Sequence, residues 1–191
     1  LTDADWVKGY ETNAGNPVST QKLFSGLKRY GINTIRIPIA WSNMMVQEKQ
    51  SDGSTYYRIN EAYFDRVEEV INYCLNEEMY VIINDHWDGQ WWGMFGDADL
   101  SVRAQAWKKY EDMWTQIANR YIDYSDRLIF EGANEELGER LNDNWKGTGG
   151  TKGVLTRKET YALTNEINQK FVDIIRKSGI NADGTKNNNY Y

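Results

Sequence analysis

The chain has 191 residues, 40% of them hydrophobic, which is enough for one substantial domain with a core. A net charge of −6 without a run of Lys or Arg argues against nucleic acid as a partner, and no stretch approaches the roughly 20 apolar residues of a membrane span. One cysteine and one histidine exclude an internal disulfide and the common metal-ligand spacings, so we expect neither a metal nor another cofactor.

Hydrophobic spacing predicts a first helix from Ser19 that ends at Gly31. Its expected apolar face comprises Leu23, Phe24, Leu27 and Tyr30. The strand that follows, 34–39, has isoleucine at every second position. This alternation places its three isoleucines on one face and Thr34, Arg36 and Pro38 on the other.

The polar segment 47–59 is expected to be a loop, and Asn60 to cap the second helix. That helix has a stripe of Tyr63, Val67, Val70, Ile71 and Cys74, which makes Cys74 a core residue and not a nucleophile. A second strand, 80–84, precedes a loop rich in Trp and Gly.

The third helix carries a core stripe of Trp107, Tyr110, Trp114, Ile117 and Tyr121. A third strand starts at Leu128, and 147–153 is a Gly/Thr-rich loop. Thr156 and Glu159 form a capping box for the last helix, which Gly179 ends before a polar tail. The expected apolar face of this helix is Thr164, Ile167, Phe171, Ile174 and Ile175.

The three strand centres, Ile35, Ile82 and Ile129, are each 47 residues apart. Because short apolar strands alternate with helices, we expect parallel strands joined by right-handed crossovers. The fold class is therefore α/β, as a portion of a (β/α)8 barrel, with a doubly wound sheet as the alternative.

Polar residues end each strand, where barrels place their chemistry. Asn134 and Glu135 would provide an amide and a general acid, or, alternatively, an N-cap and a first helical turn. Arg36 in an apolar strand needs a carboxylate partner, either at a site or in a structural ion pair. His86 follows Asn84 in the same phase and would donate to a substrate hydroxyl or a catalytic group, or would be structural.

The chain has 8 Trp and 13 Tyr, more than a core of this size needs. Several Trp lie beside Gly and Asp in loops, which favours stacking on the apolar faces of sugar rings. The alternative is that they fill a wide core.

Several stretches resemble glycoside hydrolase family 5, most of all its endo-β-1,4-glucanases. They are TIRIPIAW (34–41), VIINDH (81–86) and IFEGANE (129–135), with ETNAGNP (11–17) and NQKFV (168–172) in support. The resemblance implies that Glu135 is the general acid/base and that Asn134 binds the sugar 2-hydroxyl. It implies that Arg36 orients and keeps ionised the nucleophilic carboxylate, and that His86 is the first of a histidine pair.

By their positions, Trp41, Trp87, Trp91 and Trp92 are expected to line the glycan cleft. Two residues depart from the family pattern. Glu136 replaces the usual Pro, and its charge would either favour protonation of Glu135 or simply point to solvent. Trp87 replaces the second histidine of the pair, so some substrate contacts would differ.

A complete barrel needs about 250 residues. Residues 1–191 resemble only the portion around strands two to four, and the family's nucleophilic Glu is not among them. We therefore expect a partial catalytic domain that is inactive alone and needs a complementary fragment of the same barrel.

The complete enzyme would be a retaining endoglucanase that cleaves internal bonds of a β-1,4-glucan, and the family resemblance implies an extracellular location. The glucan could be cellulose, mixed-linkage glucan, xyloglucan or mannan. The alternative is a non-catalytic glycan-binding fragment that uses the loop tryptophans.

Overall fold

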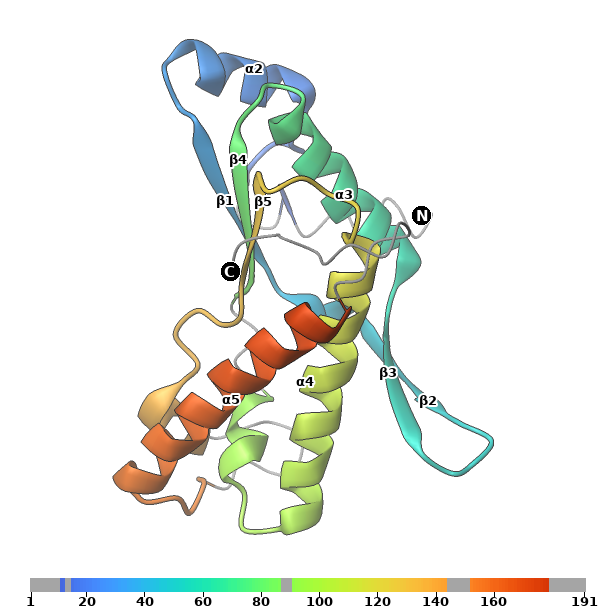
Figure 1. Cartoon of the computed structure of the whole chain (residues 1–191), viewed down its shortest axis with the longest axis vertical. Helices are drawn as coiled ribbons and strands as arrows, with labels where there is room; N and C mark the ends of the chain where they lie inside the picture. Colours follow the sequence, from blue (N-terminus) through green and yellow to red (C-terminus); the bar gives the residue numbers. More distant parts are fainter. Residues whose placement is uncertain (1–10, 13–14, 87–90, 144–151, 179–191) are drawn as a thin grey trace.

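The computed structural model describes residues 11–12, 15–86, 91–143 and 152–178, and Figure 1 shows their arrangement. The helices and strands, in chain order, are α2 (Gln21–Arg29), β1 (Thr34–Ile39), η1 (Trp41–Met44), β2 (Met45–Lys49), β3 (Thr55–Ile59), α3 (Glu61–Leu75), β4 (Tyr80–Asp85), η2 (Trp92–Gly96), α4 (Leu100–Arg120), β5 (Leu128–Glu131), η3 (Gly138–Asn142) and α5 (Arg157–Ser178). Within the described ranges no helix is both long enough and apolar enough to cross a membrane.

The central sheet has three parallel strands in the order β1-β4-β5, which confirms the predicted strands and their parallel pairing. One row across the sheet consists of Arg36, Ile82 and Ile129. The row two residues further on consists of Pro38, Asn84 and Glu131. Because side chains alternate between the two faces, these six residues share one face of the sheet.

The other face of the sheet forms the core with the helices, as Figure 1 shows for α3 beside β4. The side chains of β4 and β5 on this face are fully buried. In β1 the three isoleucines are more buried than the residues between them, as the predicted alternation requires. On the face with Arg36 and Glu131, by contrast, side chains are exposed or half-buried apart from Asn84. This is the arrangement of a barrel portion, with outer helices and an open inner face.

Residues 45–59 form a β-hairpin and not the loop that was predicted for 47–59. Its turn contains Gly53 in the left-handed region (φ 83°). The backbone N–H groups of Tyr57 and Ile59 donate to the side chains of Asp112 and Gln116 on α4, at 3.0 Å each. The strand partner of β3 is the adjacent β2, but the contacts of β3 with α4 join residues more than fifty positions apart, which a local sequence pattern cannot show.

The predicted helix ends are largely confirmed. The Asn60 side chain accepts the N–H of Tyr63, and the backbone N–H of Thr156 donates to the Glu159 carboxylate (2.7 Å) as a capping box requires. Gly31 follows α2 in the left-handed region (φ 85°). Tyr30, however, caps that helix and is 90% exposed, and Leu23 is 49% exposed, so the assignment of both to the apolar face was wrong.

Helices α4 and α5 pack on each other through the predicted apolar stripes. The rings of Trp114 and Phe171 meet edge to face at 4.7 Å between centroids.

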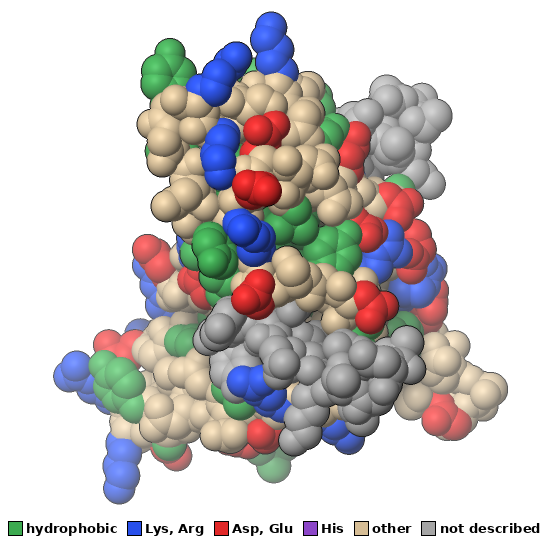
Figure 2. All heavy atoms as spheres, turned by 45° about the horizontal axis from the view of Figure 1, so that its top comes forward, with side chains coloured by type: hydrophobic (Ala, Val, Ile, Leu, Met, Phe, Trp, Pro, Cys, Tyr) green, Lys and Arg blue, Asp and Glu red, His purple; other side chains and the backbone are tan. Residues whose placement is uncertain are grey.

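Gly179, the polar tail and most of the predicted 147–153 loop lie outside the described residues. Figure 2 shows acidic and basic side chains interspersed with apolar ones on the face that it presents.

Candidate active site

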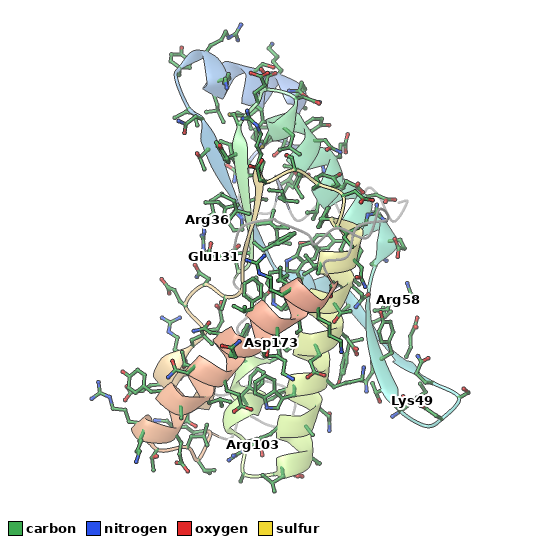
Figure 3. The ribbon with its side chains drawn as sticks, in the orientation of Figure 1. Arg36, Lys49, Arg58, Arg103, Glu131 and Asp173 are labelled. Atoms are coloured by element: carbon green, nitrogen blue, oxygen red, sulfur yellow. The ribbon has the colours of Figure 1, made fainter. Side chains whose placement is uncertain are left out.

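Arg36 from β1 forms a two-pronged ion pair with Glu131 at the end of β5 (Figure 3). Its Nε and Nη2 atoms each lie 2.7 Å from a carboxylate oxygen of Glu131, and both side chains are 35% exposed. The hydrogen bonds from Arg36 to Glu131 raise the pKa of the guanidinium. The carboxylate partner that Arg36 requires thus lies in this chain. The family resemblance had implied that Arg36 orients the nucleophilic carboxylate, which is not among residues 1–191.

Asn134 joins the same cluster, because its Oδ1 accepts a 2.9 Å hydrogen bond from Arg36 Nη2. The alternative that it caps an α-helix is wrong, since residues 132–137 are irregular and lead into the short η3 helix. The bend begins at Gly132, where a Cβ atom would lie 2.9 Å from the Phe171 ring. Glycine therefore allows the chain to leave β5 while remaining packed against α5.

Glu135 has a side chain that is 69% exposed. One carboxylate oxygen lies 3.3 Å from Arg140 Nη1, an ion pair at the surface. The carboxyl group that the sequence predicts as the general acid/base is thus accessible from solvent.

Glu136 turns the other way and is buried, with only 6% of its surface exposed. Its Oε2 atom accepts the backbone N–H of Asn134 at 2.9 Å. The expectation that this carboxylate simply points to solvent is therefore wrong.

His86 lies at the end of β4, half-buried beside Arg36. Its Nδ1 lies 3.2 Å from the amide nitrogen of Asn84 and 3.4 Å from Arg36 Nη1. Both neighbours are donors, so Nδ1 accepts and Nε2 carries the ring proton. That places a single N–H donor on the outer side of the ring, and its predicted contact with substrate stays a prediction.

Trp41 was expected to line a cleft, but the structure places it in the core with no exposed surface. Its ring packs on Tyr63 and Phe64, and its Nε1 donates to the backbone oxygen of Asn84 at 3.1 Å. A fully enclosed indole cannot stack on a sugar, so Trp41 is corrected to a packing residue that supports β4.

Trp91 and Trp92 are also buried, with their rings stacked at 4.9 Å between centroids. Phe95 and Tyr110 surround them, which corrects the expectation that both line a cleft. Trp87, the fourth predicted cleft residue, lies outside the described residues.

Sequence reasoning missed Glu131 as a residue of this site. A signal existed, because Glu131 lies two residues after Ile129 and so faces the same side of the sheet as Arg36. Glu136 was singled out as a departure from the family pattern, but its burial and its contact with Asn134 were not predicted, since strand alternation ends at the bend after β5. Among the described residues no group of three or more His, Cys, Asp or Glu could hold a metal ion.

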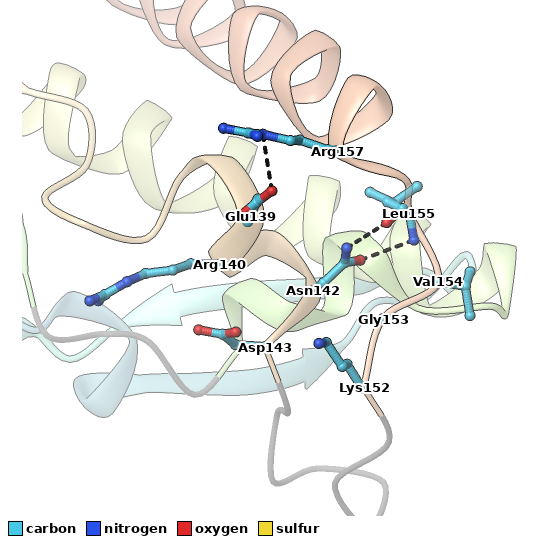
Figure 4. Close-up of a pocket in the computed structure, with 9 residues that line it drawn as sticks. All are labelled: Glu139, Arg140, Asn142, Asp143, Lys152, Gly153, Val154, Leu155 and Arg157. Carbon is cyan, nitrogen blue, oxygen red and sulfur yellow. Dashed lines mark hydrogen bonds and ion pairs between the residues drawn. The ribbon is translucent and has the colours of Figure 1, made fainter.

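A cavity of about 490 Å³ lies between η3 and the segment 152–157 (Figure 4). The Asn142 side chain closes one side through two hydrogen bonds to the backbone of Leu155. An ion pair of 3.2 Å between Glu139 and Arg157 closes another. Arg140, the ion-pair partner of Glu135, lines it too.

The sequence matches the family described as Cellulase (glycosyl hydrolase family 5) over residues 2–186. It is 36% identical over 173 residues to a xyloglucan-specific endo-β-1,4-glucanase of Bacteroides ovatus, covering 91% of this chain and 31% of that protein. Against endoglucanase B of Clostridium cellulovorans the identity is again 36%, covering 91% and 35%. The fold is similar to the tri-modular endo-β-1,4-glucanase B of Bacillus halodurans, with a TM-score of 0.71, 30% identity, and coverage of 88% and 28%.

The chain spans about a third of the length of these curated relatives. Its parallel strands with outer helices are a portion of a (β/α)8 barrel, as the sequence predicted. The match over nearly the whole chain, together with the polar cluster at the strand ends, establishes the family. The chain belongs to glycosyl hydrolase family 5.

Proposed function

We propose that this chain is part of the catalytic barrel of a retaining endo-β-1,4-glucanase in which Glu135 is the general acid/base. The observation that carries the proposal is the arrangement at the end of β5. Arg36 holds Asn134, while the adjacent Glu135 has 69% of its side chain exposed. An accessible carboxyl group beside a fixed amide can protonate a glycosidic oxygen while the amide orients the sugar.

The geometry around Asn134 supports its role toward a sugar hydroxyl. Its Oδ1 already accepts from Arg36, which fixes the orientation of the amide group. The Nδ2 atom then remains as the donor, and a hydrogen bond from it to the 2-hydroxyl would strengthen in the transition state.

A retaining hydrolase needs a second carboxylate about 5–5.5 Å from the acid/base. Glu131 is engaged by two nitrogen atoms of Arg36, so we assign it to holding that arginine and not to nucleophilic attack. The nucleophile would come from barrel strands outside this chain, on a complementary part of the same barrel. We further propose that the complete enzyme works outside the cell, where polysaccharide is found.

The proposed substrate is a β-1,4-glucan, in agreement with the endoglucanase names of the relatives. The alternative, a non-catalytic glycan-binding fragment, loses its main support because Trp91 and Trp92 are buried. In addition, a module that only binds glycan does not require an exposed carboxylate beside an amide that is fixed in orientation.

The test of Glu135 uses a complete barrel that carries this sequence. We expect Glu135→Gln to lower hydrolysis of polymeric glucan by about 10²- to 10⁴-fold, because the leaving oxygen needs a proton. Aryl glycosides with activated leaving groups should lose much less in the glycosylation step. Glu139→Gln, an exposed carboxylate in the same loop, is the matched control. Equal losses on both substrate types would exclude the acid role.

The partial character of the chain has its own test. Residues 1–191 alone should show no hydrolysis of glucan, and activity should return when the rest of the barrel is supplied. Size-exclusion chromatography with mass analysis and an activity assay decide this. A stable, active monomer of 1–191 would refute the need for complementary strands.

A further inference from the structure

Three consecutive side chains after β5 take three different directions. Asn134 points to Arg36, Glu135 to solvent, and Glu136 back into the protein. The side chain of Glu136 closes a small ring by accepting the backbone N–H of Asn134. The peptides that carry Asn134 and Glu135 lie inside this ring, so the hydrogen bond limits rotation of both.

A buried carboxylate is stable only when its charge is compensated. The hydrogen bond from Arg36 to Glu131 is the main cause of the raised pKa of Arg36, and the charge of Glu136 contributes as well. Glu136 therefore belongs to the electrostatic environment of the same arginine that holds Asn134. A carboxylate that accepts an N–H also makes a stronger hydrogen bond than a neutral acceptor would.

The segment is fixed at its start as well. At Gly132 the backbone lies so close to the Phe171 ring that a Cβ atom would approach it to 2.9 Å. The chain between this contact and the Glu136 ring is only a few residues long. Such a short tether between two fixed points leaves the residues Asn134 and Glu135 little freedom.

We propose that Glu136 is a positioning residue for hydrolysis, holding the Asn134–Glu135 peptide so that amide and acid face one glycosidic bond. This rests on the function proposed above. The family pattern places a proline here, which stiffens the backbone through its ring. Glu136 reaches a similar end by a different route, a hydrogen bond from side chain to backbone.

The decisive comparison is between Glu136→Ala and Glu136→Gln in a complete barrel that carries this sequence. Alanine removes the acceptor, and we expect kcat on polymeric glucan to fall about 10- to 100-fold because small displacements of an acid are costly. KM should change by less than about threefold, since the side chain of Glu136 is buried. Glutamine keeps an acceptor oxygen and should restore kcat to within about threefold of the native value. Glu139→Ala, which removes an exposed carboxylate from the η3 helix that follows, is the matched control and should leave kcat unchanged.

Two results would overturn the proposal: a kcat within about twofold of native for Glu136→Ala, or a loss that Glu136→Gln does not reverse. The amide proton of Asn134 gives a readout that needs no activity. In residues 1–191 its NMR signal should lie downfield because of the hydrogen bond to Glu136, and this shift should vanish in Glu136→Ala. An Asn134 signal that is unchanged by Glu136→Ala would also refute the ring. If the native complete barrel does not hydrolyse glucan, the proposed function fails. The NMR result would still test whether Glu136 accepts the hydrogen bond of the Asn134 N–H.

Discussion

Two regions of this molecule hold most of its chemically distinctive residues, and they differ in how they meet solvent. The strand-end cluster consists of Arg36, His86, Glu131, Asn134, Glu135 and Glu136, most of it on the open side of the sheet. The aromatic core around η2 consists of Trp91, Trp92, Phe95, Trp107 and Tyr110, in mutual ring contact. The sequence offered residues of both regions for a glycan site, in the second region Trp91 and Trp92, yet of the two regions only the first presents polar groups that a sugar could reach.

The difference shows that residue type alone is a poor guide to role in this chain. Tryptophan is suited to sugar stacking, but here the described indoles provide area for the core. Carboxylates and amides are costly to bury, so their gathering at one strand end is the more specific signal. Substitutions in the two regions should therefore separate stability from activity.

The largest expected effect on stability is in the aromatic core. Trp92→Ala should lower the free energy of unfolding by about 3–5 kcal/mol, because it removes a fully buried indole. Trp92→Phe should cost only about 1–2 kcal/mol, since Nε1 has no hydrogen-bond partner among the described residues. Urea unfolding measures both, and a stable Trp92→Ala protein with weakened oligosaccharide binding would restore the cleft interpretation.

Arg36→Lys in the strand-end cluster should have the opposite profile. It keeps the charge but loses the two-pronged contact with Glu131, and we expect a stability loss of about 1 kcal/mol or less for this partly exposed pair. The rate of glucan hydrolysis in a complete barrel should fall by about 10- to 100-fold, because Asn134 loses its anchor. A stability loss as large as that of Trp92→Ala, or an unchanged rate, would remove the distinction between the regions.

Trp41 connects the core to the strand ends through its hydrogen bond to the Asn84 backbone oxygen. Trp41→Phe should cost about 1–2 kcal/mol for the smaller ring, as at Trp92, and about 1 kcal/mol more for the lost hydrogen bond. Thermal unfolding reports this cost. If stability is unchanged while His86 exchanges faster with solvent by NMR, the bond acts only locally on β4.

Cys74 is a buried free thiol, and its burial raises the pKa of the thiol to about 12 from an ordinary 9.0. The folded state then keeps a proton that the unfolded state loses, so stability is full below pH 9 and declines as pH rises toward 12. By pH 9.5 this should amount to about 0.8 kcal/mol. Comparing urea unfolding of native protein and Cys74→Ala between pH 8 and 9.5 isolates the effect, and equal slopes would contradict it.

The sequence predicted the sheet well, because the alternation of Ile35, Ile37 and Ile39 depends only on which side faces the helices. It also located Asn134, Glu135 and Arg36 at converging strand ends. It failed where long-range contacts decide the outcome, as for the 45–59 hairpin, whose edge is satisfied by Asp112 and Gln116. No periodicity in the loop after β4 could indicate on which side the indoles of Trp91 and Trp92 would lie.

Arg36 and Glu131 belong to strands that are not neighbours, because β4 lies between β1 and β5. Adjacent strands are about 4.8 Å apart, so the pair spans roughly 10 Å across the inner surface. It therefore bridges the inner face of three strands. Strand number and stagger fix the radius at which a barrel closes. The same ion pair that anchors Asn134 thus occupies part of the space that further strands would enclose.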